Sequence, residues 1–138
     1  MIVNPYVQFG GRCAEAFQYY QQHLGATDPV LMPYRGSPAE EMAPAEWRDK
    51  VMHGSIKLGN VTLMGTDGRP DEAFDGMRGC SLALSVDTPD EAERVFTALS
   101  REPGMVTMPL VPTFFAQRFG TVTDQFGVAW MVICEAKP

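Results

Sequence analysis

The sequence predicts an α+β fold in which two βαβββ modules form a cupped, mostly antiparallel arrangement of eight strands. Three observations support this prediction. Patterns typical of a strand, a helix and three further strands occur twice along the 138 residues. Residues 15–20 (EAFQYY) resemble residues 91–96 (EAERVF), and residues 58–64 resemble residues 126–131. Residues 128–134 are apolar at every position, as in a strand that is covered on both faces. Internal repetition of this kind indicates that each module needs the other to bury the second face of its sheet.

The first module contains a strand, a helix and three more strands. Gly25 is placed to end the helix. Pro29 and Pro33 indicate that the second strand is an edge strand or is frayed at its ends, because proline has no backbone N–H to donate to a neighbouring strand. Gly59-Asn60 is typical of a hairpin turn. The predicted ranges are residues 5–9 (strand), 12–23 (helix), and 29–34, 51–58 and 61–64 (strands).

The second module repeats this order. Thr88, Pro89 and Glu91 predict a helix start, with Thr88 as the cap and Pro89 in the first turn. A tight turn at residues 124–127 separates the two final strands. The predicted ranges are residues 80–87 (strand), 88–101 (capped helix), 105–110 (strand) and a hairpin within 114–134.

Two features lie outside the regular elements. Residues 35–49 hold one glycine, two prolines and four acidic residues around Trp47, and are either a solvated excursion or a lid over a pocket that Trp47 would close. Asp67 and Asp124 look like a carboxylate pair at matching points of the repeat. Each follows a threonine beside a turn, where aspartate usually accepts from its own backbone two residues on.

Length and composition indicate a single domain over residues 1–138, with one module at 1–75 and the other at 76–138. The formal net charge of -6 disfavours nucleic acid and anionic membranes as partners. The start of the chain lacks the features of a signal peptide, and no apolar run reaches the roughly 20 residues that a bilayer requires. Three cysteines without C-x-x-C spacing indicate reduced thiols, so we expect a cytoplasmic protein.

Several stretches carry a resemblance to a known family. They are residues 15–20 (EAFQYY) with 24–25 (LG), 52–54 (MHG), 106–110 (VTMPL), 118–120 (RFG), and 123–128 (TDQFGV) with Trp130. On these residues the chain resembles the vicinal oxygen chelate superfamily of glyoxalase I, bleomycin-resistance proteins and extradiol dioxygenases, and more closely its PhnB-like branch. The resemblance implies a paired βαβββ fold, usually a homodimer, with a cavity inside cupped sheets.

The resemblance also implies where a divalent metal would bind. By register, the ligand positions are Tyr6, Met64, Ser81 and Met131, and none is His, Asp or Glu. Neutral thioethers serve such an ion poorly, so we expect no metal cofactor, although a divalent ion stays possible. His53 is the candidate for chemistry, either as a general base, ligand donor or lone metal ligand, or as a strand histidine bonded to a neighbour. The expected ligand-binding residues are Tyr6, His53, Met64, Ser81, Phe115, Arg118 and Met131.

Two functions remain open, and whether the protein is an enzyme is undecided. The first is a homodimer that binds a small, partly apolar molecule in the sheet cavity without metal. The alternative is a metal-dependent lyase, isomerase or dioxygenase that uses His53. A sheet that mainly serves dimerisation is a third possibility. Some PhnB-like proteins carry a demethylubiquinone methyltransferase label, but Gly10-Gly11 is too short to be the Gly-rich turn of a Rossmann-type cofactor site.

Overall fold

The computed structural model describes residues 1–137 and divides the chain into two compact units. The first unit spans Met1–Asp75 and the second begins at Gly76. Each unit is a βαβββ module with one four-stranded sheet and one helix. The predicted fold class is therefore confirmed. None of the helices formed by residues 1–137 combines the length and apolar character needed to cross a membrane.

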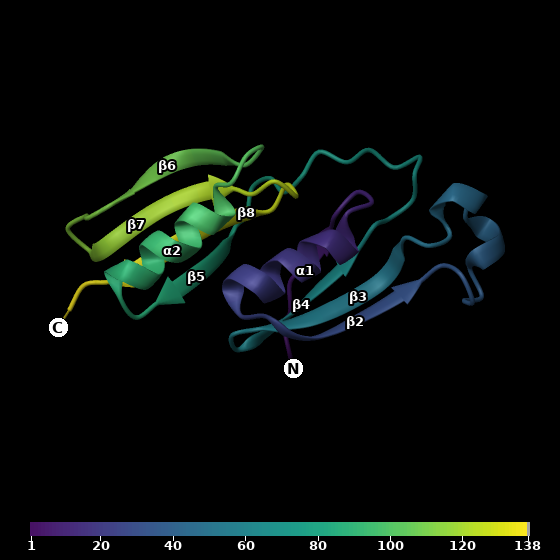
Figure 1. The fold of residues 1–138 in the computed structure, drawn as a ribbon, viewed down its shortest axis with the longest axis horizontal. Coiled ribbons are helices and arrows are strands. Elements are labelled where there is room, and N and C mark those ends of the chain that lie inside the picture. The colour runs from purple at the N-terminus through teal and green to yellow at the C-terminus, as the bar shows by residue number, and fades with distance from the viewer. Residues whose placement is uncertain (138) are drawn as a thin grey trace. The chain divides into compact units, whose positions relative to one another are not determined.

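In the first unit, the strand order is β1-β4-β3-β2, with β1 parallel to β4 and the other pairs antiparallel. The helix α1 covers one face of this sheet (Figure 1). The predicted edge position of the proline-containing strand is confirmed, because β2 has only β3 as a neighbour. The elements are β1 (Tyr6–Gln8), α1 (Cys13–Leu24), β2 (Thr27–Pro33), β3 (Val51–Leu58) and β4 (Val61–Thr66), with short 3-10 turns η1 (Glu40–Met42) and η2 (Ala45–Trp47).

Helix α1 packs on the sheet through an aromatic and small-residue stripe. Cys13, Ala16, Phe17 and Tyr20 recur at helical spacing and are buried. The helix ends at Gly25, whose positive φ of 70° suits a left-handed cap and whose N–H donates to the Tyr20 carbonyl. The sequence-based stop is therefore confirmed.

In the second unit, the strand order is β5-β8-β7-β6, and α2 covers one face (Figure 1). The helix α2 begins as predicted: the Thr88 hydroxyl accepts a hydrogen bond from the Glu91 N–H at 3.1 Å, and Pro89 occupies the first turn. The elements are β5 (Leu82–Val86), α2 (Pro89–Leu99), β6 (Met105–Val111), β7 (Ala116–Thr123) and β8 (Ala129–Glu135).

The final strand has one buried face and one half-buried face. Val128, Trp130, Val132 and Cys134 are at most 1% exposed. They face α2, which packs on β8. Between them, Ala129, Met131 and Ile133 point to the opposite face and are half-buried within the second unit.

The two turn aspartates have different roles. Asp124 accepts hydrogen bonds from the N–H groups of Phe126 at 2.9 Å and Val128 at 3.0 Å, and from the Trp130 indole at 2.8 Å. The predicted bond to its own backbone two residues on is therefore confirmed. Asp124 lies in the β7–β8 turn, whereas Asp67 follows β4, so the prediction of matching positions in the repeat is wrong.

Asp67 binds distant backbone groups instead of its own turn. Its Oδ1 accepts from the N–H groups of Gly11 at 3.0 Å and Cys13 at 2.8 Å, and its Oδ2 accepts from the Val51 N–H at 2.8 Å. The side chain is buried, with 4% exposed. This carboxylate therefore joins the end of β4 to the start of α1 and the start of β3, and the predicted local turn role is wrong for Asp67.

Replacing Asp67 should destabilise the first unit strongly. Asp67→Ala leaves three backbone N–H groups without their charged acceptor, which predicts a loss of about 3 kcal/mol or more in the free energy of unfolding. Asp67→Asn retains one acceptor oxygen and should lose less. Urea denaturation checks this, with exposed Asp75→Ala as the control. A change below about 1 kcal/mol for Asp67→Ala would contradict the role given to the carboxylate.

Candidate functional site

Three of the predicted site residues gather on one face of the first sheet. Tyr6 of β1 lies opposite Met64 of β4, and Met64 lies opposite Ser55 of β3. His53 is two residues before Ser55, so it points to the same side. Gly54, between them, faces α1: a Cβ there would lie 3.1 Å from the Phe17 ring. Tyr6, His53 and Met64 therefore lie on the face away from the helix, which we call the open face.

A stacked aromatic pair marks this open face. The Tyr6 and His53 rings lie 5.8 Å apart between centroids, with 22° between their planes. Tyr6 is 54% exposed, so much of its surface is available within the first unit. Met32 lies opposite His53 on β2 and is also exposed. The face thus presents flat and polarisable apolar surface around an imidazole that can both donate and accept hydrogen bonds.

The second sheet carries a comparable row. Met131 lies opposite Ala83 of β5 and Thr121 of β7, and Thr121 lies opposite Met108 of β6. This pairing gives Ala83 the position that Tyr6 has in the first sheet. Ser81, expected beside Met131, precedes the first residue of β5 and is exposed. The predicted strand start at residue 80 is two residues too early, so Ser81 lies just before the residues that pair with β8.

Arg118 lies on the other side of its sheet. It is paired with Cys134, which is buried on the α2 face. Its guanidinium Nε lies 3.3 Å from the Glu93 carboxylate of α2, and its Nη1 donates to the Gln117 carbonyl at 2.6 Å. Arg118 was expected to bind a ligand, but in this structure it forms an ion pair with an acidic neighbour. Arg118 does not share a face with Met131.

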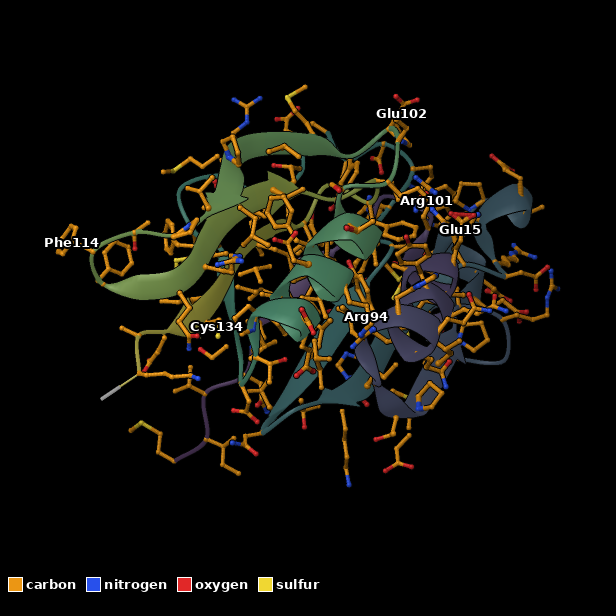
Figure 2. The ribbon with its side chains drawn as sticks, turned by 60° about the vertical axis from the view of Figure 1, so that its left-hand side comes forward. Glu15, Arg94, Arg101, Glu102, Phe114 and Cys134 are labelled. Carbon is orange, nitrogen blue, oxygen red and sulfur yellow. The ribbon has the colours of Figure 1, made fainter. Side chains whose placement is uncertain are left out.

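Phe115 belongs to an aromatic group near the β6–β7 turn. Its ring lies 5.1 Å from the ring of Phe114 and 5.1 Å from the ring of Phe119, measured between centroids. Phe119 lies opposite Ile133, on the same face of β8 as Met131. Phe114 points away from the sheet and is 99% exposed (Figure 2). Phe115 therefore extends the apolar surface on the face of the second sheet that carries Met131.

The residues present do not fit the divalent metal that the resemblance implies. Tyr6 offers a phenol, His53 an imidazole, and Met64 and Met131 offer thioethers. Across residues 1–137, no group of three or more His, Cys, Asp or Glu side chains is arranged to hold a metal ion. A divalent ion of the hard or borderline kind prefers several carboxylate and imidazole ligands. The open faces are therefore better suited to organic groups.

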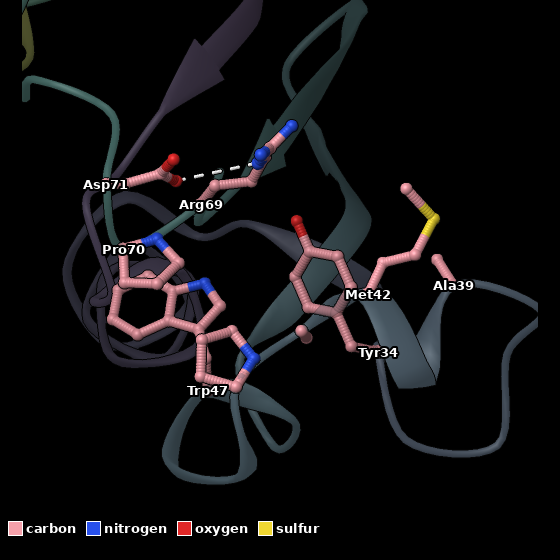
Figure 3. A pocket seen from close by; sticks show the side chains of 9 residues that line it. Tyr34, Ala39, Met42, Trp47, Arg69, Pro70 and Asp71 are labelled. Carbon is pink, nitrogen blue, oxygen red and sulfur yellow. Dashed lines mark ion pairs between the residues drawn. The ribbon is translucent and has the colours of Figure 1, made fainter.

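A cavity lies beneath the 35–49 loop of the first unit, as in the second of the two alternatives that the sequence left open for this loop. Its volume is about 380 Å³, and Trp47, Tyr34 and Met42 contribute to its walls (Figure 3). The Tyr34 hydroxyl donates to the Gly68 carbonyl at 2.7 Å, and the Trp47 indole donates to the same oxygen at 2.8 Å. The sequence indicates Trp47 as the residue that would close a pocket. No local pattern indicates that its indole donates to the Gly68 carbonyl.

The Tyr34 phenol is held in its protonated form. Burial is the main cause that raises its pKa, and the charges of Glu72, Tyr6 and Asp67 add to this, while Arg69 opposes it. A neutral phenol keeps its proton for the bond to Gly68. The bond from Tyr34 to Gly68 therefore keeps its proton to higher pH than an ordinary tyrosine would.

Comparison with known proteins identifies the family. The family described as 3-demethylubiquinone-9 3-methyltransferase matches residues 2–133. The chain belongs to this family. It is similar to Protein YjdN of Escherichia coli K12, with 31% identity covering 96% of this chain and 94% of that protein. The resemblance to the PhnB-like branch seen in the sequence is confirmed.

Solved structures show the same fold. Protein PA1353 from Pseudomonas aeruginosa has 48% identity and a TM-score of 0.86, with 99% of each chain covered. A Bacillus cereus PhnB protein, described as a putative 3-demethylubiquinone-9 3-methyltransferase, has 22% identity and a TM-score of 0.78, covering 97% of this chain and 99% of that chain. A Frankia glyoxalase/bleomycin resistance protein/dioxygenase domain has 18% identity and a TM-score of 0.58, covering 97% and 94%. The last likeness supports the vicinal oxygen chelate fold.

Cys13 is chemically inert in this fold. Burial, and to a smaller extent the charge of Asp67, raises the pKa of its thiol from 9.0 to about 12. A thiol that keeps its proton is a poor nucleophile and a poor metal ligand. Cys134 is buried as well, and Cys80 is exposed.

The raised pKa of Cys13 predicts a measurable loss of stability in alkali. Below pH 9 the thiol is protonated in both states, but between pH 9 and 12 only the folded state keeps the proton. The free energy of unfolding should therefore fall by about 1.4 kcal/mol per pH unit from this group. In Cys13→Ala this slope should be absent, so denaturation of wild type and variant at pH 9 and 11 should diverge, whereas Cys80→Ala should follow wild type. Parallel curves for wild type and Cys13→Ala would contradict the assignment.

Proposed function

We propose that this protein binds a small, partly apolar organic molecule on the open face of its sheets, without a divalent metal. The observation that carries the proposal is the exposed Tyr6–His53 stack beside Met64. Aromatic rings prefer offset or edge contacts with other aromatic rings, so an accessible stack favours a ligand with a flat apolar part. The His53 imidazole would form a hydrogen bond with a single polar group on that ligand.

Met131, Met108 and Phe115 support the same chemistry in the second unit. Methionine adapts its shape to varied apolar surfaces, so these residues suit a range of ligands. The family description names a methyltransferase, but the sequence lacks the Gly-rich turn of a Rossmann-type cofactor site, and methyl transfer is not part of the proposal. We further propose that the protein acts in the cytoplasm as a binding protein.

Binding should depend on the Tyr6–His53 stack. The probe is anilinonaphthalene sulfonate, which combines flat apolar rings with one polar group and fluoresces more strongly when bound. We expect Tyr6→Ala and His53→Ala each to weaken its binding about fivefold, the size of one lost aromatic contact. Gln18→Ala, on the exposed side of α1, is the matched control and should bind as wild type does. Unchanged affinity in both site variants would refute the proposal.

Elemental analysis of the same purified protein separates the proposal from its metal-dependent alternative. We expect substoichiometric zinc, nickel, manganese and iron, and the same melting temperature with and without excess divalent ions. Near-stoichiometric metal that is lost in His53→Ala would favour a metal-dependent lyase, isomerase or dioxygenase instead.

We also propose that the protein is a homodimer, because one edge strand of each sheet exposes apolar side chains. Val30, Leu31 and Met32 of β2, and Met105, Val106 and Met108 of β6, are each 41–66% exposed within the single chain. Exposed apolar surface of this kind marks protein–protein contacts. Sedimentation equilibrium should give twice the chain mass of 15.2 kDa, and Met108→Glu should shift the population towards monomer. A wild-type mass of a single chain at micromolar concentration would disprove the dimer.

A further inference from the structure

We propose that the cavity beneath the 35–49 loop is a second binding site, and that it takes a small zwitterionic molecule with a flat apolar body. Its volume of about 380 Å³ is in the lower part of the range for small-molecule pockets. The walls are formed mainly by Tyr34, Met42, Ala43, Pro44, Trp47 and Pro70. The cavity lies wholly within the first unit, and the inference does not depend on a ligand at the Tyr6–His53 stack.

The cavity is built before any ligand enters. Tyr34 and Trp47 both donate to the Gly68 carbonyl and so fasten the loop to the segment after β4. The backbone N–H of Trp47 donates to the Pro44 carbonyl at 2.8 Å, and the Arg48 guanidinium donates to the Ala43 carbonyl at 3.1 Å. A preformed wall lowers the entropy that binding would otherwise cost.

The hydrogen-bond donors of the two aromatic wall residues already have an acceptor within the protein. Because the Tyr34 hydroxyl and the Trp47 indole both give their hydrogens to Gly68, neither offers a free donor to a ligand. Apart from Arg69 and Asp71, the remaining walls are alanine, proline and methionine side chains. The inner part of the cavity therefore favours an apolar body, and the aromatic rings favour a flat one.

One ion pair of the protein would recognise the charges of the ligand. Arg69 Nε and Asp71 Oδ1 lie 3.5 Å apart beside Tyr34 and Pro70 (Figure 3). Their side chains are 63% and 72% exposed, and within residues 1–137 the structure gives neither a second ion-pair partner. A ligand with a single charge would be attracted by one residue and repelled by the other. A head group with both a cation and an anion satisfies both residues, which selects a zwitterion.

A series of four probes with the same ring tests this directly. The probes are indole, tryptamine, indole-3-acetate and L-tryptophan, which are respectively neutral, cationic, anionic and zwitterionic. The chain has two tryptophans, so its ¹H–¹⁵N spectrum contains two indole N–H signals, and Trp47→Phe identifies that of Trp47. We expect L-tryptophan to shift the Trp47 signal saturably and to bind roughly threefold more tightly than each other probe, the size of an exposed charge contact.

Variants separate the two ends of the cavity. Arg69→Gln and Asp71→Asn should each reduce the affinity for L-tryptophan by roughly threefold while leaving indole unchanged. Ala39→Leu fills part of the cavity and should weaken all four probes. Thr97→Ala, on the exposed side of α2 in the second unit, is the control and should bind as wild type does.

Three results would overturn the inference. Equal affinity for all four probes would show that the head group is not recognised. No shift of the Trp47 signal with any probe would show that the cavity does not bind them. Loss of L-tryptophan binding in His53→Ala would show that the cavity is not separate from the open face. Failure of anilinonaphthalene sulfonate to respond to Tyr6→Ala or His53→Ala would count against the open-face proposal alone.

Discussion

The buried carboxylate of Asp67 is the interaction on which the first unit depends. It holds the N-terminus of α1 and the first residue of β3 together at the end of β4. Fixing Val51 sets where β3 begins, two residues before His53. The residue that follows Asp67 is Gly68, whose carbonyl accepts the bonds from Tyr34 and Trp47. One side chain therefore fixes the start of the strand that carries His53 and stands next to the residue that anchors the cavity wall.

The two candidate sites of the first unit differ in how their polar groups are used. On the open face, the His53 imidazole stands beside exposed aromatic and thioether surface, and so can contribute a hydrogen bond to a ligand. In the cavity, the aromatic donors are consumed by a backbone carbonyl, and charge is offered only by Arg69 and Asp71. As proposed, the first arrangement would tolerate varied ligands, whereas the second would discriminate by charge pattern. Neither resembles the carboxylate-rich environment that a divalent ion prefers.

Local patterns in the sequence predicted most of the fold. The Thr88 cap, the Gly25 stop and the edge position of β2 each depend on a few neighbouring residues, and all three were correct. The errors concern long-range pairing. The partners of Asp67 lie 16 to 56 positions away, and the cavity wall depends on a bond from Trp47 to a carbonyl 21 residues on. A register irregularity between Ala116 and Arg118 interrupts the alternation of β7, and a shift of one residue moves a side chain to the other face. Of the predicted site residues, Tyr6, His53 and Met64 share one face, whereas Arg118 lies on the α2 side of its sheet and Ser81 precedes β5.

The shared acceptor at Gly68 has a consequence for how this protein can diversify. The bonding group is a backbone carbonyl, so no side-chain replacement at this position can delete it, while the positive φ of 65° restricts which residues can stand there. Both bonds also end on the same oxygen, so any displacement of that peptide releases Tyr34 and Trp47 together. The other lining residues of the loop are therefore free to change while Tyr34 and Trp47 keep the loop attached to the segment after β4.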